Sequence, residues 1–218
     1  MNSAKIRLRW ALACAAILLL VKAVDAEEIE RLRTFYFGNS FTGNTMPGLH
    51  PLLGESADKE WTVNALIHPG VPIWLHMVKQ MDTGSSNYQK FPKLWEQGRL
   101  GMVPVGDVFL ELDKKMRAGK VPGMVNIGEY SADGGHLRSG LPRYTLAATY
   151  YAVLFREHPN NVDWKIFQDR SNYDSGKYGF YVHQPDLAVH LDITPGRARV
   201  VNNTIWQVIS DHPYVPMA

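Results

Sequence analysis

The sequence predicts an α/β domain with a mainly parallel sheet, because short apolar runs that end in turn residues alternate with segments of helical periodicity. The first apolar run stops at Gly38, and a second run, residues 61–67, stops shortly before Gly70. No internal repeat, low-complexity tract or linker is visible between residues 27 and 218. The sequence therefore indicates a single domain over 27–218.

The strands are predicted from composition and from the residues that end them. The aromatic run Phe35–Phe37 suits a buried strand, whereas Gly38 and Asn39 tolerate the backbone angles of a tight turn. Residues 61–67 alternate imperfectly between apolar and polar and form the second strand. A third strand is predicted over residues 100–105.

The helices are predicted from apolar residues that recur at intervals of three and four. Asp107 is expected to cap one helix and Gly119 to stop it, while Thr194 caps the last helix and Pro195 occupies its first turn. Residues 158–192 have no clear pattern. The predicted helical segments are the middle and end of 46–59, then 71–81, 107–118 and 142–156, and a last helix that Thr194 caps and His212-Pro213 ends.

The first 26 residues have the layout of a secretory signal peptide. Basic residues at the start precede an apolar run from Trp10 to Val21, and small residues near Ala26 are placed for cleavage before Glu27. The apolar run has about a dozen residues, fewer than the roughly 20 that span a bilayer. An uncleaved anchor is the alternative, but the sequence favours a secreted or periplasmic protein with no stable membrane insertion after the signal is removed.

Composition bounds the classes of function. Of the 23 basic and 21 acidic side chains, four basic ones and one acidic one lie in residues 1–26, so the mature chain has a formal charge of −1. Nothing in this balance favours nucleic-acid binding. The single cysteine, Cys14, also lies in the signal peptide. We therefore expect a mature domain that is stabilised by burial and not by disulfides.

Ser40 is the first candidate catalytic residue. It follows Gly38 and Asn39 directly after the first predicted strand, where a serine would be held at a strand end facing a cleft. A serine hydroxyl needs a base to accept its proton before it can attack a carbonyl. On this stretch alone, the alternative that Gly-Asn-Ser is only a turn is equally consistent with the sequence.

Asp133 and His136 are the candidate partners for such a serine. They are separated by two glycines and stand before the long predicted helix 142–156. Their spacing allows the carboxylate to reach one ring nitrogen while the other nitrogen faces the cleft. Without Ser40, the same residues would also suit a turn that carries a surface histidine.

Together, Gly38-Asn39-Ser40 after the first strand and Asp133-x-x-His136 late in the chain resemble the SGNH (GDSL-like) hydrolases. The Gly-Asn-Ser-Phe-Thr block is similar to that of secreted bacterial SGNH-like proteins. The resemblance implies a three-layer, flavodoxin-like α/β sandwich with a mainly parallel sheet. It also implies that Ser40 attacks an ester carbonyl and that His136 and Asp133 complete a catalytic triad. One central strand of that fold is not recognisable here, because residues 82–99 are polar.

The resemblance also implies an oxyanion hole. Its donors would be the backbone N–H groups of Ser40 and of Gly70, which follows the second strand, and an asparagine side chain after the third strand. Asn87 is the one asparagine in residues 82–99, and it lacks the expected Gly-x-Asn context. Gly70 is equally compatible with a glycine that serves only a turn, whereas for Asn87 a solvated loop position is the favoured alternative.

No cofactor or metal is expected. The histidines at 68, 76, 183 and 190 are scattered, and no pair stands at the His-x-x-x-His spacing of a helix-borne metal site. The sequence thus predicts a secreted serine esterase that acts on a small-molecule or carbohydrate ester, such as an acetyl ester. The alternative is a non-catalytic extracellular module that uses the same scaffold to bind a glycan or a protein.

Overall fold

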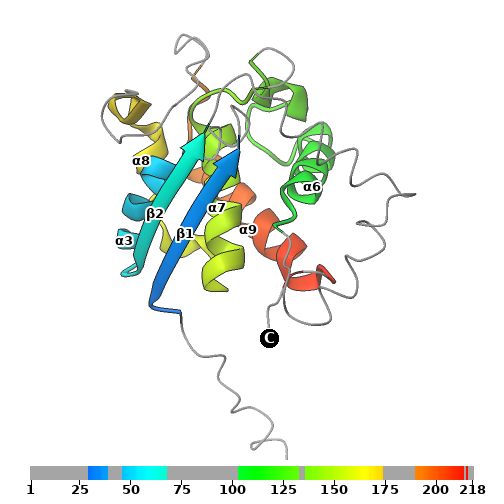
Figure 1. Cartoon of the computed structure of the whole chain (residues 1–218). Coiled ribbons are helices and arrows are strands. Elements are labelled where there is room, and N and C mark those ends of the chain that lie inside the picture. Colours follow the sequence, from blue (N-terminus) through cyan, green and yellow to red (C-terminus); the bar gives the residue numbers. More distant parts are fainter. Residues whose placement is uncertain are drawn as a thin grey trace, which may run out of the picture.

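The computed structural model describes residues 29–38, 46–67, 103–132, 136–173, 190–213 and 215 of the 218-residue chain. These residues form a mixed α/β structure in which two parallel strands and several helices surround one long central helix (Figure 1). The elements, in order, are β1 (Arg31–Gly38), η1 (Pro47–Leu49), α3 (His50–Glu55), β2 (Glu60–Ile67), α6 (Val105–Arg117), η3 (Ile127–Tyr130), α7 (Leu141–Phe155), η4 (Pro159–Asn161), α8 (Lys165–Gln168), η5 (Arg170–Tyr173) and α9 (Pro195–Asp211).

The first two predicted strands are confirmed as β1 and β2, and they pair in parallel. Their register runs from Arg31 opposite Glu60 to Gly38 opposite Ile67. Successive side chains of a strand point to opposite faces, so Tyr36 is buried while Phe35 is 67% exposed. The prediction that the whole aromatic run is buried was therefore wrong for Phe35.

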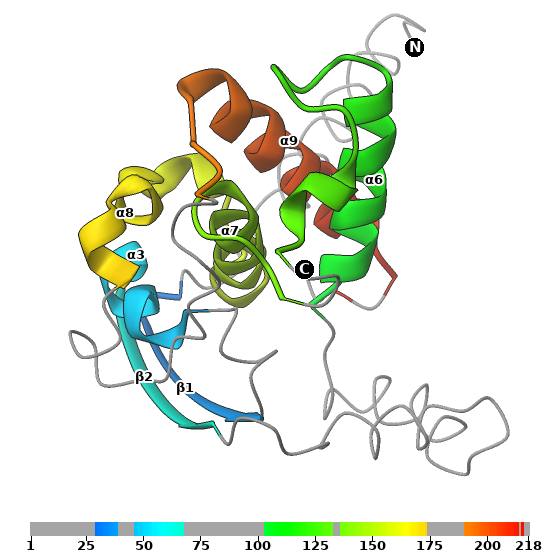
Figure 2. The ribbon, with the colours of Figure 1, turned by 90° about the horizontal axis from the view of Figure 1, so that it is seen from above.

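The central helix α7 lies between the strands and the pair of helices α6 and α9 (Figure 2). It confirms the prediction over 142–156, but 13 of its 15 residues are buried, so it is enclosed on nearly all sides rather than on one face. Tyr150 of α7 packs against Tyr36 of β1, and Phe155 packs edge-on against Trp61 of β2. On the other side, the Tyr144 hydroxyl donates to Asn202 Oδ1 of α9 at 2.8 Å.

The boundary before α6 differs from the prediction. Residues 100–105 were expected to form a strand, but α6 begins at Val105, and residues 103 and 104 are not in a strand. Pro104 explains this difference, because proline has no N–H to donate to a strand ladder and it suits the start of a helix. Asp107 consequently lies in the first turn and does not cap the helix. The predicted stop is confirmed, with Gly119 in the left-handed region at φ 69°.

The last predicted helix is confirmed as α9. The hydroxyl of Thr194 accepts a hydrogen bond from the Arg197 N–H at 3.2 Å, a cap that contributes about 1 kcal/mol in typical helices. Apolar residues of α9 then pack into the core, among them Val201, Ile205 and Ile209. Within the described ranges, no helix is long and apolar enough to cross a membrane.

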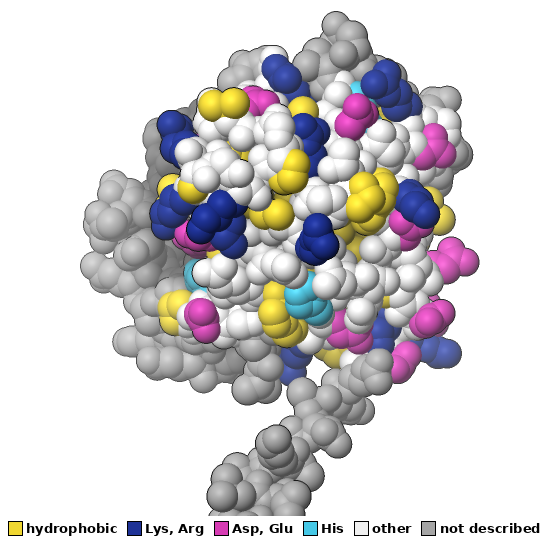
Figure 3. All heavy atoms as spheres, turned by 180° about the vertical axis from the view of Figure 1, so that it is seen from behind, with side chains coloured by type: hydrophobic (Ala, Val, Ile, Leu, Met, Phe, Trp, Pro, Cys, Tyr) yellow, Lys and Arg dark blue, Asp and Glu magenta, His cyan; other side chains and the backbone are white. Residues whose placement is uncertain are grey.

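The face opposite the strands mixes residue types. In Figure 3, basic, acidic and apolar side chains of the described residues are interspersed over this face. Some of the charged side chains form hydrogen bonds or ion pairs with neighbouring side chains. Lys115 of α6 donates to Thr204 and Gln207 of α9, and Arg117 pairs with Asp113 one turn earlier.

Candidate active site

His136 is the predicted site residue that lies within the described part of the chain. Ser40, Asp133, Gly70 and Asn87 lie outside the described residues, as do the predicted signal peptide 1–26 and the predicted helix 71–81. The structure describes the framework that flanks these predicted positions: two strand ends, the start of a helix and the contacts between them.

The first part of this framework is the carboxyl edge of the two strands. Because β1 and β2 are parallel and Gly38 is the register partner of Ile67, both strands end side by side. Ser40 follows the end of β1 by two residues, and Gly70 follows the end of β2 by three. In open parallel sheets, ligands bind in the crevice outside the carboxyl ends of the strands.

The second part is the start of α7, which runs antiparallel to the strands. The end of α7, at Phe155, packs on Trp61 near the start of β2, while Tyr150 packs on Tyr36 near the end of β1. The first turn of α7 is thus directed to the carboxyl edge, behind the arrowheads of β1 and β2 in Figure 1. His136 precedes this helix by five residues and belongs to the same edge.

The backbone around His136 is fixed by a short antiparallel bridge. Ser131 pairs with Leu137, the Ala132 N–H donates to the His136 carbonyl at 2.8 Å, and the Arg138 N–H donates to the Tyr130 carbonyl at 2.9 Å. The Arg138 side chain adds a bond from Nε to the Ser131 carbonyl at 2.8 Å. His136 is half-buried.

Arg143, in the first turn of α7, joins the two loops of this edge. Its Nη1 donates to Met46 Sδ at 3.0 Å, and its Nε and Nη2 lie 3.4 and 3.3 Å from the Leu137 carbonyl oxygen. Met46 is the first described residue after the segment that contains Ser40, and Leu137 is the neighbour of His136. Burial lowers the pKa of the Arg143 guanidinium to about 10, so the group stays charged at neutral pH.

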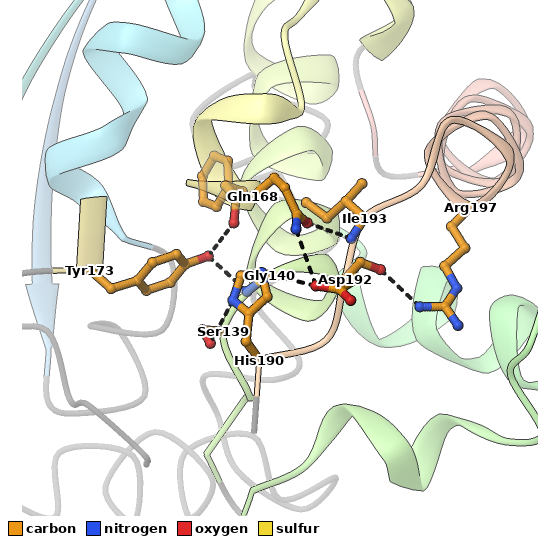
Figure 4. Close-up of polar contacts among 9 residues, drawn as sticks. Ser139, Gly140, Gln168, Tyr173, His190, Asp192, Ile193 and Arg197 are labelled. Carbon is orange, nitrogen blue, oxygen red and sulfur yellow. Dashed lines mark hydrogen bonds and ion pairs between the residues drawn. The ribbon is translucent and has the colours of Figure 1, made fainter. Parts of the chain in front are cut away.

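A second serine and histidine meet just after His136, in the cluster shown in Figure 4. Ser139 Oγ lies 3.0 Å from His190 Nδ1, and His190 Nε2 lies 3.9 Å from Asp192 Oδ1. The order of these side chains is that of a catalytic triad. However, Ser139 is only 2% exposed and the His190 side chain is fully buried, so the pair has no access to a substrate.

The cluster instead fastens the loop of His136 to the segment before α9. Gly140 bridges in parallel to Leu191: the Leu191 N–H donates to the Ser139 carbonyl at 3.1 Å, and the Leu141 N–H donates to the Leu191 carbonyl at 2.9 Å. The Gly140 N–H donates to the Tyr173 hydroxyl, which itself donates to the Phe167 carbonyl. This set of bonds fixes the entry into α7.

The segment 190–193 is held in turn by two helices. Gln168 of α8 accepts from the Ile193 N–H at 2.7 Å and donates to Asp192 Oδ1 at 3.1 Å, and Arg197 of α9 donates to the Asp192 carbonyl at 2.9 Å. The histidine itself is neutral at pH 7: burial and the nearby Arg170 lower the pKa of His190, and Asp192 only partly opposes them. The neutral ring shares a hydrogen bond with the Ser139 hydroxyl at Nδ1, while His190 Nε2 is buried 3.9 Å from Asp192 Oδ1 without a hydrogen-bond partner among the described residues.

Sequence reasoning missed both Arg143 and the pair of Ser139 and His190. His190 was classed only among the scattered histidines. One signal was available for Arg143, because it is the single charged residue in the sequence of α7, Leu141–Phe155. Among the described residues, no group of three or more His, Cys, Asp or Glu side chains is placed to hold a metal ion.

The opposite end of α7 has an open polar hollow of about 420 Å³, lined in part by Asp58, Lys59, Glu157 and Asn161. Lys59 is 4% exposed, and its Nζ lies 2.8 Å from Glu157 Oε1. Glu157 also accepts hydrogen bonds from the Tyr151 hydroxyl and from Asn161 Nδ2. The hollow lies at the starts of the strands, away from the carboxyl edge.

Comparison of the chain with models of protein families, with curated proteins and with solved structures finds no match.

Proposed function

We propose that the mature chain is a secreted or periplasmic serine hydrolase of SGNH type that cleaves an ester bond. In this proposal the domain is a three-layer α/β sandwich, and Ser40, His136 and Asp133 form its catalytic triad. The observation that carries the proposal is the contact of Arg143 with both Leu137 and Met46. It links the residue after the proposed base to Met46, the first described residue after the segment that contains the proposed nucleophile.

The strands support the same arrangement. The proposed nucleophile and the proposed donor Gly70 follow neighbouring parallel strands whose last residues, Gly38 and Ile67, are register partners. A backbone N–H from each loop can then point at one oxygen atom. The third donor, proposed as Asn87, has no comparable support.

The reaction follows from these roles. His136 accepts the proton of the Ser40 hydroxyl as Oγ attacks the ester carbonyl, and the N–H groups of Ser40 and Gly70 stabilise the oxyanion. Asp133 orients the imidazole and stabilises its charged form. The protonated His136 then gives its proton to the leaving alcohol, and water, activated by the same imidazole, releases the acid and regenerates Ser40. We propose acetyl or other short acyl groups on carbohydrate as the substrate class.

The experiment uses mature protein, residues 27–218, with two readouts. One is hydrolysis of 4-nitrophenyl acetate and butyrate. The other is labelling by a fluorophosphonate, in which a serine oxygen forms a bond to phosphorus and fluoride leaves, followed by mass spectrometry of the labelled peptide. We expect the label on Ser40 and a loss of kcat of at least about 10³-fold in Ser40→Ala and His136→Ala.

Ser139→Ala is the matched control, because Ser139 is the other serine in contact with a histidine. We expect it to keep the label on Ser40 and to lower turnover by no more than about tenfold, because only the side-chain contact with His190 is lost. Label on Ser139 would refute the assignment of the nucleophile. Neither label nor turnover, together with polysaccharide binding that survives Ser40→Ala, would instead establish the non-catalytic binding module.

A further inference from the structure

Arg143 is an unusual residue for its position. It is fully buried in the first turn of a helix that is enclosed on nearly all sides, and it is the only charged residue of that helix. Taking a guanidinium out of water is costly, and well-packed apolar residues at such sites are often as stable or more stable. Overall stability alone is therefore a poor reason for an arginine at this position.

The contacts of Arg143 indicate what it does. Among the described residues, its planar fork reaches three separate segments: the Leu137 carbonyl in the loop of His136, Met46 Sδ after β1, and the ring of Tyr173, 5.7 Å from the guanidinium carbon. Tyr173 is the residue whose hydroxyl accepts from the Gly140 N–H. Two of these contacts are therefore made to residues that set the position of the loop between η3 and α7, and the third is made to the segment after β1.

The geometry of these contacts needs a guanidinium. Nε and Nη2 converge on one carbonyl oxygen while Nη1 points to a sulfur on a different segment, 97 residues away in the sequence. A lysine has the same charge but only one nitrogen, on a flexible stem, so it cannot make both contacts in a fixed relation. A methionine could fill the volume but donates nothing.

We propose that Arg143 is a positioning residue for the reaction: by linking the Leu137 carbonyl to Met46 Sδ, it sets the imidazole of His136 relative to the nucleophile. This inference rests on the proposed function, in which the nucleophile is Ser40. Arg143 has no direct contact with substrate in this proposal and acts through the backbone of the residue after His136.

The first test is steady-state kinetics on Arg143→Lys and Arg143→Met. A small displacement of a catalytic group lowers the rate of the chemical step by up to roughly a hundredfold. We expect kcat to fall by about 10- to 100-fold in both variants, with KM changed less than about threefold, because substrate binding does not use Arg143. Full activity in Arg143→Lys would show that the charge suffices and would overturn the proposal.

The matched control is Glu157→Gln, which disrupts the buried ion pair at the other end of the same helix. It is expected to lower stability while leaving kcat within about twofold. An equal fall of kcat in this control would show that general destabilisation explains the effect, and this outcome too would overturn the proposal.

A third variant covers the case in which the Arg143 variants do not fold. Met46→Leu removes the sulfur acceptor at nearly constant volume and leaves the charge in place. We expect kcat to fall by about 3- to 10-fold, since one of the two linked contacts remains. An unchanged kcat in Met46→Leu would overturn the link between the two loops.

The second readout does not depend on turnover. The ring Cε1–H signal of His136 is followed by ¹H–¹³C correlation NMR and assigned by its loss in His136→Gln. We expect this signal to shift in Arg143→Lys and Met46→Leu and to stay in place in Glu157→Gln. A shift without any esterase activity would refute the proposed function and keep the positional link, whereas an unshifted signal in active, folded variants would refute the link alone.

Discussion

The two ends of α7 are held by different kinds of contact. At the end near Phe155, the contacts are made at the start of β2: Lys59, just before β2, pairs with Glu157, two residues after α7, and Trp61 of β2 packs on Phe155. At the beginning, the contacts go to loops: Gly140 is enclosed by Leu191 and Tyr173, and Arg143 reaches one carbonyl oxygen and one sulfur outside any helix or strand.

The difference indicates that the contacts near Phe155 mainly stabilise the fold, whereas the contacts at the beginning of α7 fix the position of a loop. An ion pair that also accepts hydrogen bonds from a hydroxyl and an amide tolerates small shifts of the backbone, because the long side chains can adjust their conformations to keep the contact. Bonds to backbone carbonyls of a loop fix the path of the chain itself. Sites are most precise when their loops are held in this way by a rigid scaffold. The beginning of α7 is therefore the end at which we place the chemistry.

The largest expected effect is at Gly140. Its φ is 79°, and a Cβ there would lie 2.2 Å from the Leu191 carbonyl oxygen and 3.0 Å from the His190 ring. We expect Gly140→Ala to lower the free energy of unfolding by about 3 to 5 kcal/mol, since overpacking and a left-handed backbone for alanine act together. Chemical denaturation followed by circular dichroism measures this change.

Gly106→Ala is the control for that substitution. Gly106 lies in the first turn of α6, and a Cβ there would meet nothing within 4 Å. We expect it to leave stability unchanged or to raise it by up to about 1 kcal/mol, because alanine is the better helix former. Comparable destabilisation by both substitutions would contradict the close packing of Gly140 on Leu191.

The sequence predicts well the elements whose signals are local. Thr194 and Pro195 mark the start of α9, and Gly119 marks the stop after α6. The wrong prediction of a strand up to Val105 also has a local cause. It followed the apolar pattern of residues 100–105, although Pro104 should have ended the predicted strand. Burial of α7 on all sides was underestimated because helical periodicity reports one face and not what covers the other.

The contacts that hold the candidate site could not be predicted, because they depend on distant parts of the chain. Ser139 and His190 are 51 residues apart, and Arg143 and Met46 are 97 apart. Neither pair has a motif. The predicted positions of Ser40, Asp133, Gly70 and Asn87 remain predictions, whereas the parallel strands that precede two of them are confirmed.

The second expected effect is at the other end of α7. Glu157→Gln leaves Lys59, which is 4% exposed, without its nearest carboxylate, although Glu30 remains 3.7 Å away. We expect a loss of about 2 to 3 kcal/mol, somewhat below the usual cost of breaking a buried pair, because Glu157 is itself 19% exposed. The measurement is again chemical denaturation, and an unchanged stability would contradict the ion pair.

The acid dependence of stability sharpens this prediction. Burial raises the pKa of Glu157, but hydrogen bonds from Lys59, Tyr151 and Asn161 outweigh it and place the pKa below its usual value of 4.5. As the pH falls, Glu157 therefore takes up its proton in the unfolded chain before it does so in the folded chain. Its contribution to the free energy of unfolding is present above pH 4.5 and is lost as the pH falls through the pKa of the folded state. Glu157→Gln should flatten the stability profile in this range.

The smallest expected effect is at His190, beside the start of α7. Replacement by glutamine removes the hydrogen bond between the His190 ring and Ser139 Oγ, and it should lower the free energy of unfolding by about 1 kcal/mol at pH 8. The groups that face the ring are Asp192, Arg170 and the edge of Tyr173, and burial is the main cause that lowers the pKa of His190. The unfolded histidine takes its proton near pH 6.5, before the folded one does.

The wild type should therefore lose stability as the pH falls from about 6.5 toward the folded pKa of His190, and His190→Gln should lose less. Burial also lowers the pKa of His158, which accepts the Asn160 N–H at Nδ1, so part of the dependence persists in the variant. His158→Gln removes that part separately. His190 holds the loop of the proposed base, so its protonation should also lower kcat below pH 6.5. His158 lies beside Trp206 at the far end of α7, so its protonation should change stability alone.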